Sequence, residues 1–175
     1  SDVCSSDLAQ AMARLRTNSA EQAEQHLDSL RRLSQHPELQ EVTVWDINTT
    51  AEIIKIATRV VAGELAAERG QMETAVEHLR EAVGLEDALN YDEPPTWHHP
   101  VRHTLGAILL EAGQPEEAER AYREDLQRFP ENGWSLYGLM KSLEAQGEKE
   151  ASDAVRTRFE QAWSRADVSL TSSRM

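Results

Sequence analysis

The residues best suited to chemistry lie between Asp87 and Pro100, where acids, histidines and aromatic side chains stand close together. Carboxylate and imidazole groups bind metal ions and transfer protons, and aromatic rings anchor ligands. Pro94-Pro95 is expected to hold this insert in an extended path. The insert is therefore a candidate binding wall, formed by Tyr91, Asp92, Glu93 and His98 beside Trp97. The alternative is that Trp97 only fills a gap left by a long connection.

Three histidines, His98, His99 and His103, raise the question of a metal site. His99 and His103 are four residues apart at the start of a predicted helix, so both could face one ion, with a carboxylate from Asp92 or Glu93. Their spacing matches no established zinc signature, and Pro100 restricts His99. We therefore predict no metal and no cofactor. A metal- or small-ligand-binding helical domain built on these histidines stays as the alternative function.

An enzyme is not predicted. The chain contains no nucleophile elbow, no HExxH motif and no phosphate-binding loop. Glu93 and His98 could act as an acid/base pair, but no nucleophile stands out beside them. The only cysteine is Cys4, so the rest of the chain has no thiol for disulfides, thiolate zinc sites or Cys/His catalysis.

A repeated pattern of helices and turns surrounds the insert and is expected to position its residues. The turn Glu111-Ala112-Gly113-Gln114 recurs as Ala145-Gln146-Gly147-Glu148, and 147 − 113 = 34 residues separate the two glycines. A third turn, Glu68-Arg69-Gly70-Gln71, lies 113 − 70 = 43 residues before Gly113, which is 34 plus an insert of 9. Each turn separates two stretches with helical apolar periodicity, so helical hairpins are predicted.

The helices follow from apolar stripes and end signals. Thr49 and Glu52 form a capping-box pattern that starts a helix ending before Gly70. Gly106 and Ala118 are predicted to lie where the two helices of a pair approach most closely, since a large side chain would separate them. The expected helices are 20–33, from 49 to before 70, 72–85, 101–112, 115–129, 134–145 and 149–170.

Two segments fit this scheme poorly. Residues 42–45 alternate like a strand without a second candidate strand, so we expect a packed connector or short helix with Trp45 filling the core. Residues 1–8 fit no helix period and resemble a translated sequencing adapter. The helix of residues 20–33 would then lack its partner, and its stripe of Ala23, Leu27 and Leu30 would be exposed, so that the chain frays or self-associates there.

The last two helix pairs carry a known spacing. The repeat pattern W-x2-L-G-x2-Y, A-x3-F and P is matched by Arg102, Leu105-Gly106, Leu109, Ala118, Tyr122 and Pro130. The chain thus resembles a tetratricopeptide-repeat (TPR) protein. With motifs such as Tyr91-Asp92-Glu93-Pro94-Pro95 and Trp97-His98, it resembles the C-terminal part of uncharacterised bacterial TPR proteins, a group that implies no activity. Asp125 and Ser152 depart from the pattern, which usually has Ala at both positions.

The resemblance implies an all-α fold: a right-handed α-solenoid of antiparallel helix pairs, a TPR-like superhelix, with a long C-terminal capping helix. One helical-repeat domain is expected at 9–175, after the adapter-like segment 1–8. Its parts are a partial repeat (9–36), a connector (37–48), a repeat (49–86), the insert (87–98), a repeat (99–132), the last repeat and cap (133–170) and a tail (171–175).

The net charge of the chain limits the classes of partner that it is expected to bind. The net charge is −13, with 31 acidic and 18 basic residues, which disfavours nucleic acid and anionic membranes. No apolar run is long enough to insert into a membrane. A protein or peptide partner is expected, basic or neutral rather than acidic. The compartment of the bacterial cell, cytoplasm or periplasm, is left open.

The position of each residue within the repeat predicts where a ligand-binding groove would lie. The inner positions of the last two first-helices are Pro100, His103, Ala107 and Leu110, then Trp134, Tyr137, Lys141 and Glu144. Exposed aromatic residues on such a groove are typical peptide anchors. The predicted function is a protein–protein interaction module, part of a longer bacterial protein, that binds a peptide or protein through Trp97, His103, Trp134, Tyr137 and Lys141.

Overall fold

The computed structural model describes residues 2–17 and 19–174. Its contacts divide the chain into two compact units, residues 1–101 and 102–175, here called the N-terminal and C-terminal units. Nine helices and one two-stranded sheet lie within the described residues, so the predicted all-α class is confirmed. No helix in this part of the chain is long and apolar enough to cross a membrane.

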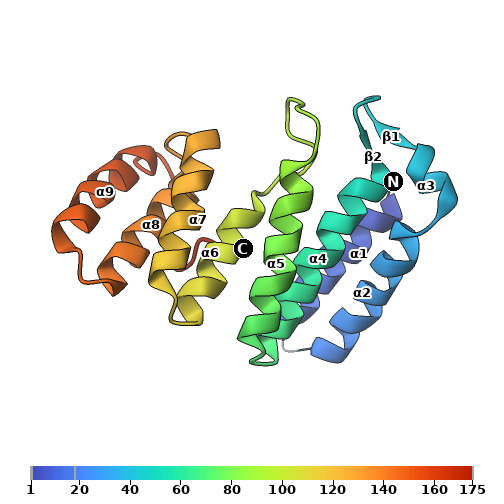
Figure 1. The fold of residues 1–175 in the computed structure, drawn as a ribbon, viewed down its shortest axis with the longest axis horizontal. Helices are drawn as coiled ribbons and strands as arrows, with labels where there is room; N and C mark the ends of the chain where they lie inside the picture. Colours follow the sequence, from blue (N-terminus) through green and yellow to red (C-terminus); the bar gives the residue numbers. More distant parts are fainter. Residues whose placement is uncertain (1, 18, 175) are drawn as a thin grey trace. The chain divides into compact units, whose positions relative to one another are not determined.

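Helix α4 (Thr50–Glu68) is the centre of the N-terminal unit and packs against α1 (Asp2–Arg16), α2 (Ala20–Ser34) and α5 (Met72–Asp87) (Figure 1). Because it has neighbours on several sides, its apolar residues occupy more than one face, as the sequence indicated. The predicted capping box is present. The Glu52 amide donates to Thr49 Oγ1 at 3.2 Å, and the Thr49 amide donates to Glu52 Oε2 at 2.7 Å.

The N-terminal segment corrects two expectations. Residues 2–8 are helical, because α1 begins at Asp2, and α1 is the partner helix that α2 was expected to lack. Ala23, Leu27 and Leu30 are 0%, 1% and 0% exposed, so the α2 stripe is covered and offers no apolar surface for self-association. No helix was expected before residue 20, because residues 1–8 show no helical period and the buried apolar residues of α1, Ala11 and Leu15, lie in its second half. Asp7 nevertheless accepts hydrogen bonds from His26 and Ser29 of α2 at 2.8 and 2.7 Å.

The connector between α2 and α4 also differs from the expectation. The short helix α3 (Pro37–Glu41) is followed by a hairpin of β1 (Thr43–Val44) and β2 (Asn48–Thr49). Trp45 and Asp46 form its turn with φ of 51° and 60°, the geometry that matches the twist of two antiparallel strands. Trp45 is 60% exposed and fills no core. The alternation of residues 42–45 indicated β1, but the two residues of β2 are too short to show a period, so the pairing was not predicted.

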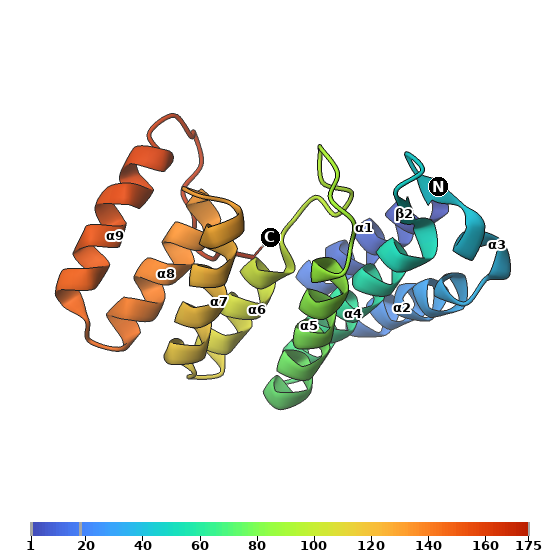
Figure 2. The same cartoon turned by 45° about the horizontal axis from the view of Figure 1, so that its top comes forward.

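The C-terminal unit contains α6 (Val101–Glu111), α7 (Pro115–Arg128), α8 (Gly133–Ala145) and α9 (Lys149–Ala162), drawn side by side in Figure 2. In both units the recurring turn glycines have a conformational reason. Gly70, Gly113 and Gly147 have φ of 73°, 71° and 78°, a left-handed conformation that only glycine adopts without cost. The 34-residue spacing therefore marks the turn inside each hairpin, as predicted.

Tyr122 of α7 is the centre of packing in this unit. Its ring lies between Gly106 of α6 and Gly138 of α8, and a Cβ atom at either glycine would overlap the ring. The predicted close approach at Gly106 is confirmed, and Ala118 is fully buried. Burial raises the pKa of the Tyr122 hydroxyl well above its ordinary value, so this group stays protonated and can donate a hydrogen bond.

The end of the chain differs from the prediction. Helix α9 stops at Ala162 instead of continuing to residue 170, and the following residues return to α6 and α7. Ser173 is buried: its hydroxyl donates to the His103 carbonyl at 2.9 Å and lies 2.6 Å from the Tyr122 hydroxyl, which must therefore be the donor of that pair. Arg174 contacts both carboxylate oxygens of Glu111, at 2.9 and 3.0 Å. The predicted tail is thus anchored at Ser173 and Arg174.

Candidate functional site

Four partly exposed aromatic side chains form a cluster on α8 and α9. Trp134 meets Trp163 edge to face with ring centroids 4.9 Å apart, Trp163 stacks on Phe159 at 5.9 Å, and Phe159 meets Tyr137 at 5.6 Å. Such pairs add stability beyond the area that they bury. We call Trp134, Tyr137, Phe159 and Trp163 the aromatic cluster.

Lys141 lies at the edge of the aromatic cluster. Its Nζ atom is 5.7 Å from the centre of the Tyr137 ring, within cation–π distance, and 2.9 Å from Glu144 Oε2. Arg156 of α9 reaches the other oxygen of Glu144 at 2.6 Å. These two cations lower the pKa of Glu144, chiefly through the hydrogen bond from Lys141. The surface thus combines apolar rings with a fixed row of alternating charges.

The predicted groove residues do not all share one surface. Trp134, Tyr137 and Lys141 follow one another along α8 and are partly exposed, as a binding surface requires. His103 is only 1% exposed, so the expectation of an exposed histidine is wrong. Trp97 is buried and belongs to the N-terminal unit, with the ring of His98 5.6 Å away.

The insert residues lie in the N-terminal unit. Tyr91 is 81% exposed, and Asp92 accepts a hydrogen bond from the Thr96 amide at 3.0 Å. A hydrogen bond to Glu93 raises the pKa of Tyr91. Glu93 and His98 are exposed. The insert therefore presents polar groups to solvent around one buried tryptophan.

His103 has a structural partner. Its Nε2 atom lies 3.1 Å from Asp125 Oδ2, and Ser135 donates to the same oxygen at 2.5 Å, with all three side chains buried. The serine hydroxyl points at the carboxylate and not at the imidazole, so this is not the order of a Ser-His-Asp catalytic relay. The network ties α6, α7 and α8 together, and it explains why Asp125 replaces the usual alanine of the repeat. The sequence did contain a signal for this network, because Asp125 is an acidic residue within an apolar stripe.

The histidines do not build a metal site in the described part of the chain. No group of three or more histidine, cysteine, aspartate or glutamate side chains is arranged there to hold an ion. His103 is engaged with Asp125, whereas His98 is exposed beside Trp97. His98 and His99 belong to the N-terminal unit, and His103 to the C-terminal unit.

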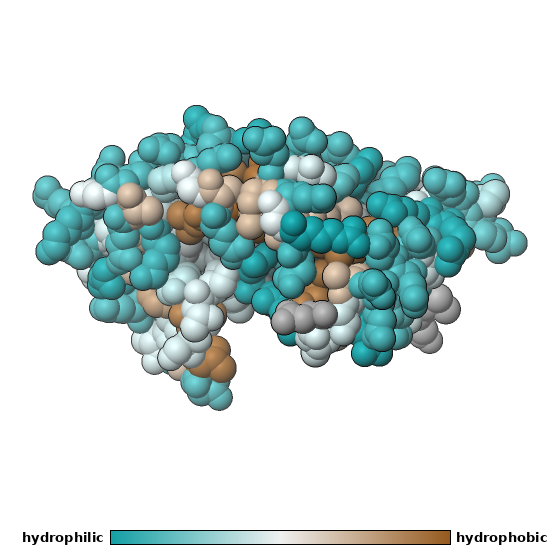
Figure 3. All heavy atoms as spheres, turned by 90° about the horizontal axis from the view of Figure 1, so that it is seen from below, coloured by the Kyte–Doolittle hydropathy of each residue, from teal (hydrophilic) through white to brown (hydrophobic). Residues whose placement is uncertain are grey.

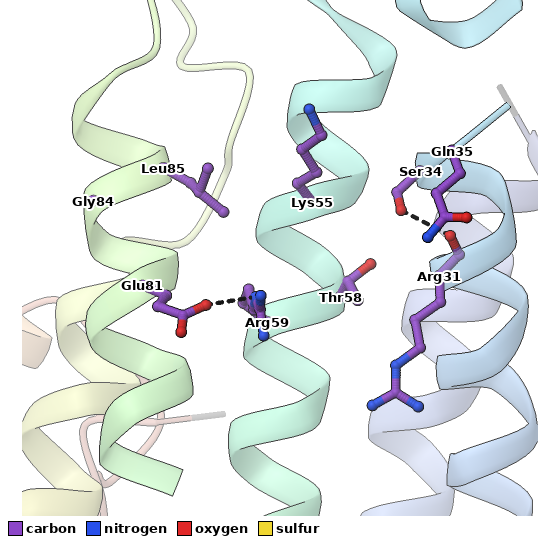
Figure 4. A pocket seen from close by; sticks show the side chains of 9 residues that line it. All are labelled: Arg31, Ser34, Gln35, Lys55, Thr58, Arg59, Glu81, Gly84 and Leu85. Atoms are coloured by element: carbon purple, nitrogen blue, oxygen red, sulfur yellow. Dashed lines mark hydrogen bonds and ion pairs between the residues drawn. The ribbon is translucent and has the colours of Figure 1, made fainter. Parts of the chain in front are cut away.

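Sequence reasoning missed a hollow in the N-terminal unit. It measures about 700 Å3 and lies over α4 between α2 and α5 (Figure 4). Three of its lining side chains are cationic, Arg31, Lys55 and Arg59, and one is acidic, Glu81. The available signal was the pair Lys55 and Arg59, one turn apart on a helix that is otherwise largely apolar.

The fold and the turn spacing define a helical-repeat protein, and residues 56–81 and 99–124 match the family model "Tetratricopeptide repeat". The chain thus contains two segments that match the tetratricopeptide repeat. Over 97% of its length it is similar to 98% of the chain in the crystal structure of MamA protein, with a TM-score of 0.52 and 10% sequence identity. At that identity the likeness shows the fold alone. No curated protein sequence matches this chain.

Proposed function

We propose that the C-terminal unit binds an extended segment of a protein partner across the exposed side of the aromatic cluster, with Lys141 at its edge. The tetratricopeptide fold supports a protein-interaction scaffold as the general role. The observation that carries the finer proposal is the row of Trp134, Tyr137 and Lys141, all partly exposed along one side of α8.

The chemistry of this surface selects the ligand class. Partly exposed tryptophan and tyrosine rings accept apolar side chains with little loss of conformational entropy, and such rings dominate many interfaces. The chain has a net charge of −13, which favours the approach of basic segments. A peptide with apolar anchors and flanking lysine or arginine therefore fits best. His103 supports the surface from below by stacking on Trp134 at 6.3 Å.

Peptide selection tests the proposal without a known partner. Random peptides displayed on phage are selected on the wild-type protein, and the recovered peptides are titrated against Tyr137→Ser/Lys141→Ser. We expect this variant to bind more weakly by about 2 kcal/mol, or roughly thirtyfold. Tyr137 and Lys141 are chosen because neither is fully buried, so the fold should tolerate the change.

A matched control changes the outer face of α7. Arg120 is exposed and pairs with Glu117, and Arg123 pairs with Glu119 at 2.7 Å. Arg120→Ser/Arg123→Ser should leave peptide affinity within about twofold, since exposed ion pairs contribute little. If the α7 variant loses the selected peptides and the α8 variant keeps them, the binding surface lies on α7 and the proposal is wrong.

A further inference from the structure

The hollow over α4 concentrates positive charge in an acidic protein. Acids outnumber bases 31 to 18 in the chain, yet the lining contains Arg31 from α2, Lys55 and Arg59 from α4, and a single acid, Glu81 from α5. The remaining lining residues are Ser34, Gln35, Thr58, Gly84 and Leu85. These residues come from α2 and the residue after it, from α4 and from α5, so the hollow opens on the side of α4 that faces α2 and α5.

Arg59 is held in position inside the hollow. Its Nε atom lies 2.8 Å from Glu81 Oε2, and its Nη1 group lies 3.2 Å from His78 Nδ1. Burial, and then the charge of Arg59, lower the pKa of His78, so His78 is neutral at pH 7 and accepts the hydrogen bond. A guanidinium has five N–H groups, so further donors stay available to a ligand.

Lys55 and Arg31 are held by fewer interactions with the protein than Arg59 is. Lys55 is exposed and forms no ion pair with any other residue in the described ranges, and its neighbour Glu52 is occupied by the capping box with Thr49. Among the residues that the structure describes, Arg31 pairs only with Asp28, three residues away on its own helix, at 2.9 Å. Both members of that pair are about half exposed, so a ligand carboxylate can compete with Asp28 at little cost.

The cations are spread out rather than convergent. Figure 4 shows Lys55 above Arg59 on α4, with the Lys55 ammonium at the top of the view, and Arg31 across the hollow on α2 with its guanidinium at the bottom of the view. A single small anion is bound best by donors that converge on it. Cations separated along a trough suit several carboxylates carried along one chain, and the side chain of Leu85 on α5 offers an apolar contact on the other side of α4 from Arg31.

We propose that this hollow binds an acidic segment of a protein partner, with aspartate or glutamate side chains paired to Lys55, Arg31 and Arg59. The occupant follows from charge complementarity and from the spacing of the three cations. The site uses the N-terminal unit alone and does not depend on the proposed peptide surface of the C-terminal unit. It also reverses locally the preference for basic partners that the net charge implies.

Fluorescence anisotropy with a labelled decapeptide of alternating glutamate and alanine tests the proposal. We expect the full chain to bind this peptide, and the affinity to fall as salt is raised, because exposed charge pairs are screened. The same peptide with glutamine in place of glutamate should not bind. Lys55→Glu/Arg31→Glu should weaken binding at least about tenfold, since like charges then face the ligand.

The matched control carries the same change in net charge elsewhere. Lys149 and Arg165 are exposed and lie outside the hollow, and Lys149→Glu/Arg165→Glu should change affinity less than about threefold, through the long-range field alone. Equal losses in the two variants would overturn the proposal, because net charge would then explain the binding. The milder Lys55→Gln/Arg31→Gln, with unfolding midpoints for every variant, separates lost binding from lost folding.

Two further outcomes would assign a different occupant. If millimolar inorganic phosphate alone displaces the labelled peptide at constant ionic strength, the site is a small-anion site and not a docking site for an acidic segment. If sedimentation shows that the wild type associates and Lys55→Glu/Arg31→Glu does not, the occupant is a second copy of this acidic chain. Peptides selected on the aromatic cluster serve as an independent reference, since their binding should be unchanged in the reversed variant.

Discussion

At the scale of single residues, Tyr122 determines how closely three helices pack. Its ring fills the space that Gly106 and Gly138 leave free, and its hydroxyl reaches past them to Ser173 at 2.6 Å. Two helices can approach a large ring on both sides only where each contributes no side chain. The two glycines are therefore required for packing and not for backbone conformation, unlike the turn glycines.

A glycine series tests this packing. Gly106→Ala and Gly138→Ala should each destabilise the protein by about 1–3 kcal/mol, because the added methyl group forces the Tyr122 ring to move. Gly84→Ala is the control: it lies within α5 with no atom within 4 Å of the new Cβ, and it should stabilise by about 0.5–1 kcal/mol through helix propensity. Urea unfolding measures all three. Similar losses at all three positions would contradict the role of the ring.

His78 makes the free energy of unfolding depend on pH, and its lowered pKa fixes the direction of that dependence. Burial and Arg59 lower its pKa below the ordinary histidine value of 6.5. As the pH falls through about 6.5, the unfolded chain binds a proton at this residue before the folded protein does, so the free energy of unfolding decreases. Above that range the residue is neutral in both states and its contribution is constant.

Replacing His78 isolates this effect. His78→Gln keeps an acceptor for Arg59 and removes the titration, so its unfolding free energy should fall less steeply than that of the wild type between about pH 7 and pH 5. Urea unfolding across that range gives both slopes, and the difference between them cancels the other histidines. Identical slopes would show that His78 titrates alike in the folded and unfolded states.

At the scale of elements, the apolar stripe of α2 is covered by other helices, so its residues stabilise the fold and do not form an association surface. Leu27 is 1% exposed between α1 and α4, so Leu27→Ala should cost about 2–5 kcal/mol by leaving a cavity. Its sedimentation should match that of the wild type, because no association surface is lost. A variant of unchanged stability that dissociates from an oligomer would instead show that the stripe is an exposed contact.

The last segment shows that elements need not be helices to be fixed. After α9 ends at Ala162, Trp163 turns back to donate to the Val168 carbonyl at 2.7 Å, and Ser173 is buried against α6 and α7. Without Ser173 the buried Tyr122 hydroxyl would lose its hydrogen-bond partner, which is costly in a buried place. The repeat end is therefore completed by returning chain rather than by a longer helix.

At the scale of the whole molecule, the net negative charge and the local positive charge of the hollow favour different ligands. Hydrophilic side chains cover most of the face shown in Figure 3, and apolar residues reach it only in small groups. The net charge of −13 sets the long-range field and favours basic partners. The hollow over α4 has the opposite sign at short range. We therefore expect two interaction surfaces that select ligands of opposite charge.

Local patterns in the sequence determined the hairpins. The turn glycines, the capping box and the apolar stripes placed α4 to α8 within a few residues, because turn conformation and helix period depend on neighbours in the chain. The close helix approach at Gly106 was also predicted, because a small residue at this position of the repeat indicates a close crossing; that the ring of Tyr122 fills the space came only from the structure. The start of α1, the pairing of β1 with β2 and the end of α9 were not. Residues 1–8 show no helical period, β2 is too short to show one, and apolar residues continue at helical spacing past the end of α9 at Ala162.

Only the tertiary structure decided which side chains are available. The partners of His103 are Asp125, 22 residues away, and Ser173, 70 residues away, and no spacing rule links them. The exposed histidine expected from repeat phase is therefore buried, whereas Trp134 and Tyr137 stay partly exposed. The basic hollow needs residues from three helices, and it exists only because α2 and α5 pack on α4 at the positions that leave Lys55 and Arg59 between them. Periodicity identifies the face of a helix, but exposure depends on what packs against that face.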